Sequence, residues 1–347
     1  MGEVFNKTKY YEKYLGGDMV EDVAIYFSFN SRFDPFEKGI AQFNWLNKDS
    51  YPHQKSILGA ANTLIESHIP FGVITKKNLD KLTNYKILIL SNVISVDEEE
   101  FNNIYSFVKN GGLLYASGII PEMVLNDIFK LEYLGITKEN ITYITPTAKG
   151  FKLIEDIDED NPLVIRDHQV LVKSKEYKDV LAKLVLPYTD PNDISKFASI
   201  HSNPPGIKTD FASIVCKKVK SGKAIYVSGP LEKFNEVPHK KTFINIIKYL
   251  YPKGFSLISE APYSVEITVF SQKKKKRFIL NIVNMQEKFP AIPVYDFKVK
   301  LKVLNKEIYK VVSLTYKEDL KFLKMKDYIE INIPKLELFN MILVKYN

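Results

Sequence analysis

Cysteine and tryptophan are almost absent from this 347-residue sequence, which holds one of each. The lone Cys216 excludes an internal disulfide framework and favours a reducing compartment, so we expect a cytoplasmic protein. The opening residues lack the apolar core of a signal peptide, and no later run reaches the length of a transmembrane helix. The sequence therefore predicts a soluble protein with no membrane partner.

Recognisable cofactor and metal motifs are also missing. There is no G-x-G-x-x-G and no Walker loop, because "KSGKA" at 220–224 lacks the upstream glycine. The histidines are scattered, with no pair at helix spacing and no H-E-x-x-H. We therefore predict neither a metal site nor a cofactor. The five histidines are His53, His68, His168, His201 and His239.

Two acidic runs are the only candidates for paired catalytic carboxylates. "EDIDED" at 155–160 reads as a solvated loop. "DEEE" at 97–100 reads as the first turn of a helix, where Asp97 caps the helix and the acids favour its dipole. Gly111 closes the same helix. Neither run predicts glycoside-hydrolysing chemistry.

The formal net charge of +8 is concentrated in "KKKKR" at Lys273–Arg277. Alternating apolar residues flank this run at 265–269 and 278–282, which predicts two strands joined by a lysine-rich hairpin tip. Such a tip is most often solvated, and no nucleic-acid-binding motif accompanies it. Nucleic acid is therefore an unlikely partner.

Nearly continuous apolar runs at 22–29 and 85–92 are typical of parallel strands buried on both faces. Amphipathic helices at 53–69 and 97–111 alternate with these runs and with a strand ending at Ser117. The rhythm predicts an α/β fold with a mostly parallel sheet and helices on both faces. We expect Val23–Phe29 as a central strand with Ile87–Ser91 beside it.

The last part of the chain, from 259 on, alternates apolar and polar residues in short runs without a useful helix. This pattern predicts a small antiparallel β-sandwich. The predicted organisation is a linker or arm at 1–20, an α/β domain at 21–255 and the sandwich at 256–347.

Ser117 and Cys216 are the two possible nucleophiles. A nucleophile elbow requires small residues two before and two after the serine, but here these are Tyr115 and Ile119. A serine after a strand more commonly caps the next helix. Cys216 stands within a strand, where a free cysteine is usually a small buried hydrophobe. We therefore predict no catalytic residue, with no histidine close to either side chain.

Four phrases of the sequence resemble a known family. They are "DVAIYFSFNSR", the helix ending in "IPFGVIT", the strand "YKILILSN", and "FVKNGG" before the next strand. Together they resemble the trimerisation domain of bacterial β-galactosidases, which implies a flavodoxin-like, class I glutamine-amidotransferase-like fold without the amidotransferase catalytic residues. Ser91 stands where that family usually has proline. "APYSVEITVFSQKKKKRFILNIVNMQ" resembles the carboxyl-terminal β-sandwich of α-L-fucosidase-like and β-galactosidase-like hydrolases.

In those hydrolases a (β/α)8 barrel carries the catalytic carboxylates, and the few residues before the first predicted strand are too short for one. The resemblance therefore implies a non-catalytic oligomerisation or accessory module of a glycoside hydrolase. Its partner would be further copies of itself or a barrel-bearing hydrolase.

Two alternatives remain open, a carbohydrate-binding protein and a cryptic glycoside hydrolase. A sugar pocket would lie where the parallel strands end. The polar residues there equally suit helix capping. They are Ser28, Asn30, Asn92 and Ser117.

Overall fold

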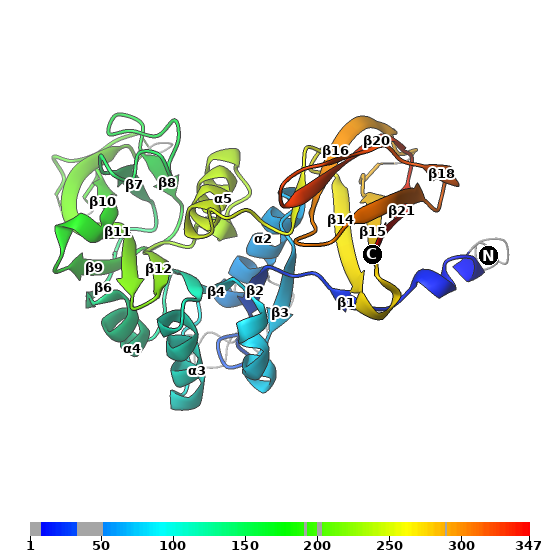
Figure 1. Cartoon of the computed structure of the whole chain (residues 1–347). Helices are drawn as coiled ribbons and strands as arrows, with labels where there is room; N and C mark the ends of the chain where they lie inside the picture. Colours follow the sequence, from blue (N-terminus) through cyan, green and yellow to red (C-terminus); the bar gives the residue numbers. More distant parts are fainter. Residues whose placement is uncertain (1–7, 33–50, 191–192, 200–202, 289) are drawn as a thin grey trace. The chain divides into compact units, whose positions relative to one another are not determined.

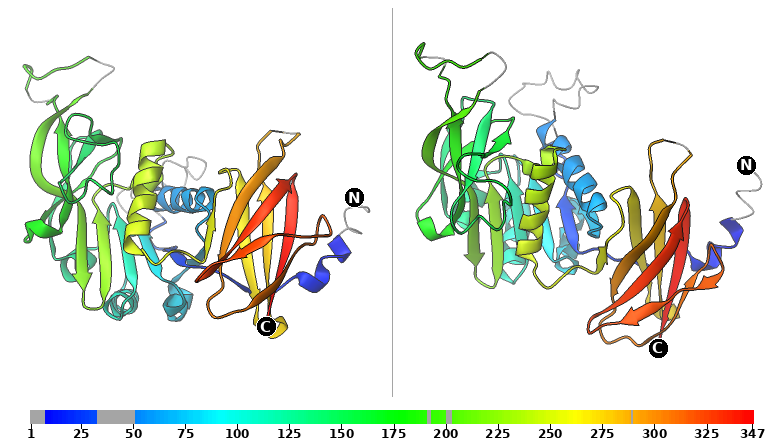
Figure 2. Two further views of the ribbon diagram at one scale, coloured as in Figure 1. Left: turned by 45° about the horizontal axis from the view of Figure 1, so that its top comes forward. Right: turned by 90° about the horizontal axis from the view of Figure 1, so that it is seen from above.

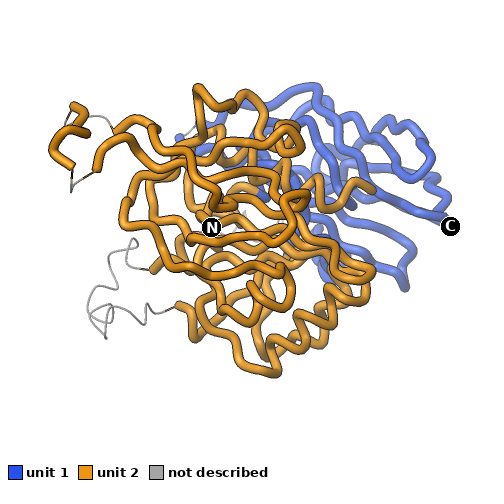
Figure 3. The backbone as a smooth tube through the Cα atoms, turned by 90° about the vertical axis from the view of Figure 1, so that its left-hand side faces the viewer, with its two compact units in different colours: residues 1–22, 64–71, 254–347 blue, residues 23–63, 72–253 orange. Residues whose placement is uncertain are grey.

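The computed structural model describes residues 8–32, 51–190, 193–199, 203–288 and 290–347. The chain forms two compact units (Figure 3). Unit 1 comprises residues 1–22, 64–71 and 254–347, and unit 2 comprises residues 23–63 and 72–253.

Unit 2 is built on a large mixed sheet whose first half is parallel (Figure 1). Strands β2 (Val23–Tyr26), β4 (Ile87–Ser91), β5 (Leu113–Ser117) and β12 (Gly222–Val227) pair in parallel in that order. The expected runs at 22–29 and 85–92 are thus interior neighbours. However, β2 lies next to the edge strand β3 (Phe71–Ile74) rather than at the centre of the sheet.

The second half of this sheet is antiparallel, so the prediction of a mostly parallel sheet is wrong. β12 is followed by β11, β10, β7 and β8, all paired antiparallel, and β9 joins β6 to β11 in the same manner. Three of these pairs, β7–β8, β10–β11 and β11–β12, join strands that are consecutive in the chain without a crossover helix, which favours antiparallel pairing. The other pairs join strands that are not consecutive in the chain. Their bounds are β6 (Leu131–Ile136), β7 (Thr142–Pro146), β8 (Leu163–Ile165), β9 (Val170–Ser174), β10 (Val180–Pro187) and β11 (Pro205–Val219).

Helices cover both faces of the parallel half. Leu114 and Ala116 of β5 share a core with Ile104 of α3 (Glu98–Lys109). Since side chains alternate along a strand, Tyr115 points the other way, and its ring meets Phe243 of α5 (Val237–Leu250) at a centroid distance of 5.1 Å. Shorter helical segments complete the unit. They are α4 (Glu122–Val124), η5 (Lys76–Asn84), η6 (Leu125–Phe129), η7 (Tyr177–Asp179) and η8 (Leu231–Lys233).

The predicted ends of α3 are confirmed. The Asp97 side chain accepts a hydrogen bond from the Glu100 N–H at 2.9 Å, and the Glu100 side chain accepts one from the Asp97 N–H in return. Gly111 follows the helix with φ of 108°, a left-handed conformation that glycine adopts at little cost. Among the described residues, a further long helix, α2 (Pro52–Glu66), coincides with most of the predicted 53–69 helix.

Unit 1 contains two antiparallel sheets that share one apolar core (Figure 2). The predicted lysine-tipped hairpin is confirmed as β14 (Val265–Gln272) and β15 (Arg277–Asn284). The six-stranded sheet adds β1 (Asp18–Met19), β17 (Ile308–Ser313), β18 (Glu318–Asp319) and β21 (Phe339–Tyr346). The four-stranded sheet contains β13 (Leu257–Ser259), β16 (Val294–Lys302), β19 (Phe322–Lys324) and β20 (Tyr328–Leu336).

The described part of the expected linker, residues 8–20, is packed on unit 1. Its β1 pairs with β14, and the rings of Tyr11 and Tyr14 pack beside Ile279 and Met341. The Gln272 amide donates hydrogen bonds to the carbonyls of residues 14–16 at 2.6–3.0 Å. A polar, Gly-broken stretch does not reveal such docking, because the partners lie some 250 residues away in the sequence.

The basic tip is therefore only partly solvated. Lys273–Lys276 are exposed, whereas the Arg277 guanidinium donates to the Gln272 side-chain oxygen and to the Lys13 carbonyl, both at 2.5 Å. The same guanidinium lies over the Tyr14 ring. Arg277 and Gln272 thus hold the amino-terminal segment against the six-stranded sheet.

We predict that Gln272→Ala loosens this segment. Loss of its amide hydrogen bonds should raise the rate of limited tryptic cleavage after Lys13 about 5- to 30-fold, because cleavage requires local opening. Lys274→Ala, at an exposed position of the same tip, is the matched control and should leave the rate unchanged. Mass spectrometry measures the rate of cleavage after Lys13. Equal cleavage rates for the wild type and Gln272→Ala would contradict the prediction.

Candidate functional site

The carboxyl ends of β4 and β5 bring two of the four predicted pocket residues together. The Asn92 N–H donates to the Ser117 carbonyl at 2.9 Å, directly after β4. The Asn92 side chain accepts from the Ile119 N–H at 3.0 Å and donates to the Ser56 hydroxyl at 2.8 Å. Asn92 is buried and its hydrogen-bonding groups are satisfied within the chain, so it serves the corner backbone and offers nothing to a ligand.

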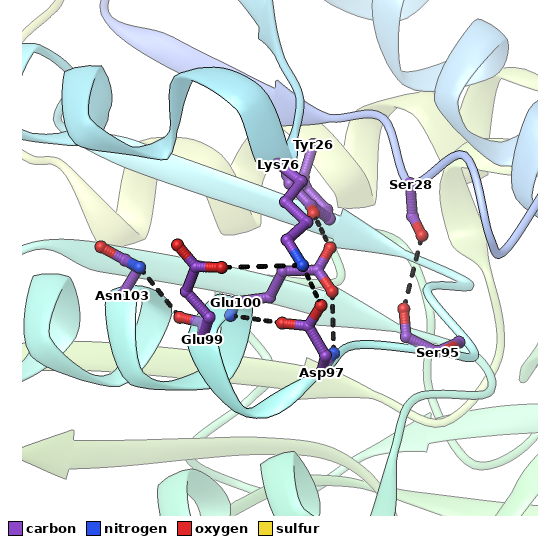
Figure 4. Close-up of polar contacts among 8 residues, drawn as sticks. All are labelled: Tyr26, Ser28, Lys76, Ser95, Asp97, Glu99, Glu100 and Asn103. Carbon is purple, nitrogen blue, oxygen red and sulfur yellow. Dashed lines mark hydrogen bonds and ion pairs between the residues drawn. The ribbon is translucent and has the colours of Figure 1, made fainter.

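Ser28 belongs to a separate buried group after β2. Its hydroxyl lies 3.4 Å from the Ser95 carbonyl (Figure 4) and accepts hydrogen bonds from the N–H and hydroxyl of Ser31. Asn30 is exposed and lines a cavity that none of the other three predicted residues lines. The four residues therefore do not form one pocket.

His53 is held by both ring nitrogens. Its Nε2 accepts from the Ser28 N–H at 3.1 Å, which leaves Nδ1 as the donor to the Ser91 carbonyl at 2.7 Å. Burial lowers the pKa of His53, and the hydrogen bond to the Ser91 carbonyl opposes this only in part. The imidazole is neutral and fully engaged, so it is not poised as a general base.

Ser117 donates its hydroxyl to a carboxylate instead of capping a helix, so that expectation is wrong. Its Oγ lies 2.5 Å from Glu232 Oε1, and the Tyr115 hydroxyl lies 2.6 Å from Glu232 Oε2. All three side chains are buried. Burial raises the pKa of Glu232, although the two hydroxyl donors oppose this, and burial also raises the pKa of Tyr115. Ser117 is shielded from solvent and has no histidine partner among the described residues, so it lacks the setting of a nucleophile there.

Glu232 is the main residue that sequence reasoning missed. It lies in η8, just after the β12 corner, and meets Ser117 across 115 residues of sequence. The only local signal was an acid closing the otherwise apolar and small stretch "YVSGPLE". The apolar neighbours suggest burial, but they do not reveal the two hydroxyl partners.

A cavity of about 870 Å³ opens beside this edge of the sheet, between β2, the start of η5 and the first turn of α3. At its inner side the Tyr26 hydroxyl donates to Glu100 Oε1, and Lys76 forms an ion pair with Asp97 (Figure 4). Burial raises the pKa of Tyr26, with a further contribution from Glu100. The lining residues are Tyr26, Phe27, Phe29, Asn30, Thr75, Lys76, Lys77, Glu99 and Glu100.

The remaining sequence candidates form no catalytic arrangement with one another in the part of the chain that is described. Cys216 lies in β11 but is only half-buried, not buried as expected, and burial raises the pKa of its thiol. His68, His168 and His239 each bond a backbone carbonyl, whereas His201 lies outside the described residues. In the acidic run at 155–160, Glu155 and Asp156 form surface ion pairs with Lys241.

Among the described residues, no group of three or more His, Cys, Asp or Glu side chains could hold a metal ion. No helix in this part of the chain is both long and apolar enough to cross a membrane.

Comparison with solved structures identifies the fold in several glycoside hydrolases. α-L-Fucosidase isoenzyme 2 from Paenibacillus thiaminolyticus aligns with a TM-score of 0.78 at 17% identity, over 100% of this chain and 52% of that one. A catalytic mutant of Gan42B, a GH42 β-galactosidase from G. stearothermophilus, gives 0.63 at 16% identity, over 99% and 43%. The β-galactosidase from Bacillus circulans sp. alkalophilus gives 0.63 at 13%, over 99% and 44%.

The chain thus spans about half the length of these enzymes or less. A search of the curated proteins found no match. The sequence matches the family described as the beta-galactosidase trimerisation domain over residues 21–237, which is more than half of the chain. The protein therefore belongs to the β-galactosidase trimerisation domain family.

Proposed function

We propose that this chain is a non-catalytic oligomerisation module of a cytoplasmic glycoside hydrolase system in carbohydrate metabolism. The observation that carries the proposal is the match to the trimerisation domain family over residues 21–237. The partners are further copies of the chain or a hydrolase that bears the catalytic barrel. The substrate-cleaving residues then lie outside this sequence.

The chemistry of the strand ends supports a non-catalytic role. The Ser117 hydroxyl is committed to the buried Glu232, and both nitrogens of His53 are committed to backbone groups. An activated nucleophile requires a base within hydrogen-bond reach and access to substrate. Neither candidate meets both requirements, which weighs against the alternative of a cryptic hydrolase.

We also propose the finer fold assignment. Parallel strands with helices on both faces support a flavodoxin-like, class I glutamine-amidotransferase-like domain at 21–255, with the antiparallel half of the sheet added to it. The two antiparallel sheets around one core support a β-sandwich of the hydrolase type at 256–347.

The hairpin between β10 and β11 offers an assembly surface within the matched range. The described tip residues 193–199 project from the rest of unit 2 (Figure 2). Ile194 is 95% exposed and Phe197 is 78% exposed. The tip has its own turn, in which Ser195 donates to the Asp193 carboxylate at 2.6 Å. Large exposed apolar side chains beside a hydrogen-bonded turn favour a protein contact.

We predict that the protein runs as a trimer in size-exclusion chromatography with light scattering. The double variant Ile194→Lys/Phe197→Lys should weaken assembly at least about 30-fold, because it places two charges in an apolar contact. The weaker assembly is measured as a rise in the protein concentration below which the trimer dissociates.

Phe151→Lys is the matched control, since Phe151 is also an exposed phenylalanine of unit 2, 55% exposed, outside the hairpin. It should assemble as wild type does. A wild-type protein that is strictly monomeric and also fails to bind a barrel-bearing hydrolase would contradict the proposed function. A trimer unaffected by the double variant would contradict only the hairpin's role.

A further inference from the structure

We propose that the cavity beside β2 and α3 is a binding site for a neutral saccharide. Its volume of about 870 Å³ falls within the range of roughly 300–1,000 Å³ seen for small-molecule sites. The proposal goes beyond the assembly role and does not depend on it. It rests on three properties of the lining: exposed aromatic surface, balanced charge and an unengaged amide.

The aromatic surface comes from Phe27 and Phe29. The two rings contact each other edge to face with centroids 6.3 Å apart. Phe29 is 65% exposed at the cavity, an unusual position for a phenylalanine in a folded domain. The apolar face of a pyranose ring can pack on such an aromatic side chain and cover it.

The formal charges of the described lining residues balance, with Lys76 and Lys77 against Glu99 and Glu100. Lys76 is also ion-paired with Asp97, so these residues offer no excess of positive charge. An anionic ligand would gain little from this lining and would meet the Glu99 carboxylate. A neutral polyhydroxylated ligand suits it, since ammonium and carboxylate groups donate to and accept from hydroxyls at the same time.

The polar groups of the inner wall are hydrogen-bonded within the protein, whereas two polar side chains of the rim are exposed. Glu100 is buried and accepts from the Tyr26 hydroxyl and from the Asp97 N–H at 2.7 Å. At the rim, the Glu99 side chain is 74% exposed, and its carboxylate lies 3.7 Å from Lys76. Asn30 is exposed, and its side chain makes no hydrogen bond with any other described residue. Asn30 and Glu99 therefore offer a donor and acceptors to sugar hydroxyls.

The experiment is saturation-transfer-difference NMR with calorimetry on the full chain, using methyl β-galactoside, methyl α-mannoside and galacturonate as probes. We expect saturable millimolar binding of at least one of the two neutral methyl glycosides, and no tighter binding of galacturonate. Phe29→Ala should weaken the binding about tenfold. Asn30→Ala should weaken it severalfold by removing the unengaged amide.

Phe151→Ala is the matched control, because it removes an exposed phenylalanine of the same unit outside the cavity. It should bind sugar as wild type does. Absence of binding by either neutral probe, preference for galacturonate, or equal binding by Phe29→Ala and Phe151→Ala would each overturn the proposal. Light scattering on the same variants keeps this result separate from assembly, since the oligomer mass should not change with any of them.

Discussion

Replacing Glu232 by alanine is expected to lower the free energy of unfolding by about 3 kcal/mol at pH 5. The substitution leaves the hydroxyls of Tyr115 and Ser117 buried without their acceptor, and it opens a cavity in a fully enclosed place. Each unsatisfied buried hydroxyl costs about 1–3 kcal/mol. Urea unfolding measures the loss of unfolding free energy, and hydrogen exchange of the β5 amides shows whether the loss affects the strand that carries Tyr115 and Ser117.

The triple variant Glu232→Ala/Tyr115→Phe/Ser117→Ala is the control for this prediction. It removes the donors with the acceptor, so the cavity remains while the unsatisfied hydroxyls do not. It should recover about half of the loss caused by Glu232→Ala. If Glu232→Ala is as stable as the wild type, or if the triple variant is no more stable than Glu232→Ala, the hydrogen bonds contribute little to stability.

The same carboxyl predicts how stability depends on pH. Burial raises the pKa of folded Glu232 above its ordinary value of 4.5, so the folded state keeps the proton longer than the unfolded state. The contribution of Glu232 to the free energy of unfolding is fully present below pH 4.5. It is lost as the pH rises through the folded pKa, by at most about 1.4 kcal/mol per pH unit. Glu232→Gln does not titrate and should lack this slope. Parallel pH profiles for the two proteins would contradict the assignment.

Much of the fold could be predicted because its signals are local. The apolar runs at 22–29 and 85–92 contain the buried strands Val23–Tyr26 and Ile87–Ser91, which have no polar interruption in their middle, and Asp97 stands at the start of an acidic turn. Such patterns depend on a few neighbouring residues. The orientation of the added strands β6 to β11 could not be derived this way, because it depends on which distant strand each one meets.

The candidate site was predicted less well for the same reason. Ser28, Asn92 and Ser117 do lie at or just after the ends of parallel strands, but their partners come from two other segments, His53 and Ser56 from α2 and Glu232 from η8. Those partners convert apparent ligand groups into internal structure. The Asn30 side chain has no such partner among the described residues, and Asn30 lines the cavity. Position at a strand end thus predicts where polar groups gather, whereas their availability depends on packing.

Gly59→Ala is expected to destabilise unit 2 by about 2–3 kcal/mol, although alanine normally stabilises a helix relative to glycine by about 1 kcal/mol. Gly59 lies within α2, where a Cβ atom would overlap the Glu232 carbonyl oxygen and lie 3.0 Å from the Glu232 carbonyl carbon. These are backbone atoms that cannot rotate away. Either α2 or η8 must therefore shift, and a shift of η8 displaces the carboxyl that Ser117 and Tyr115 bond.

Asn62→Ala is the control, since Asn62 is an exposed position of the same helix and should show the ordinary small gain from alanine. Combining Gly59→Ala with Glu232→Ala tests whether the clash acts through the buried carboxyl. If it does, the double variant costs less than the sum of the two single losses, by about 1 kcal/mol, because the second change removes bonds that the first has already strained. Strict additivity would mean that α2 yields instead of η8. Unfolding of the two single variants and the double variant under one condition decides between these outcomes.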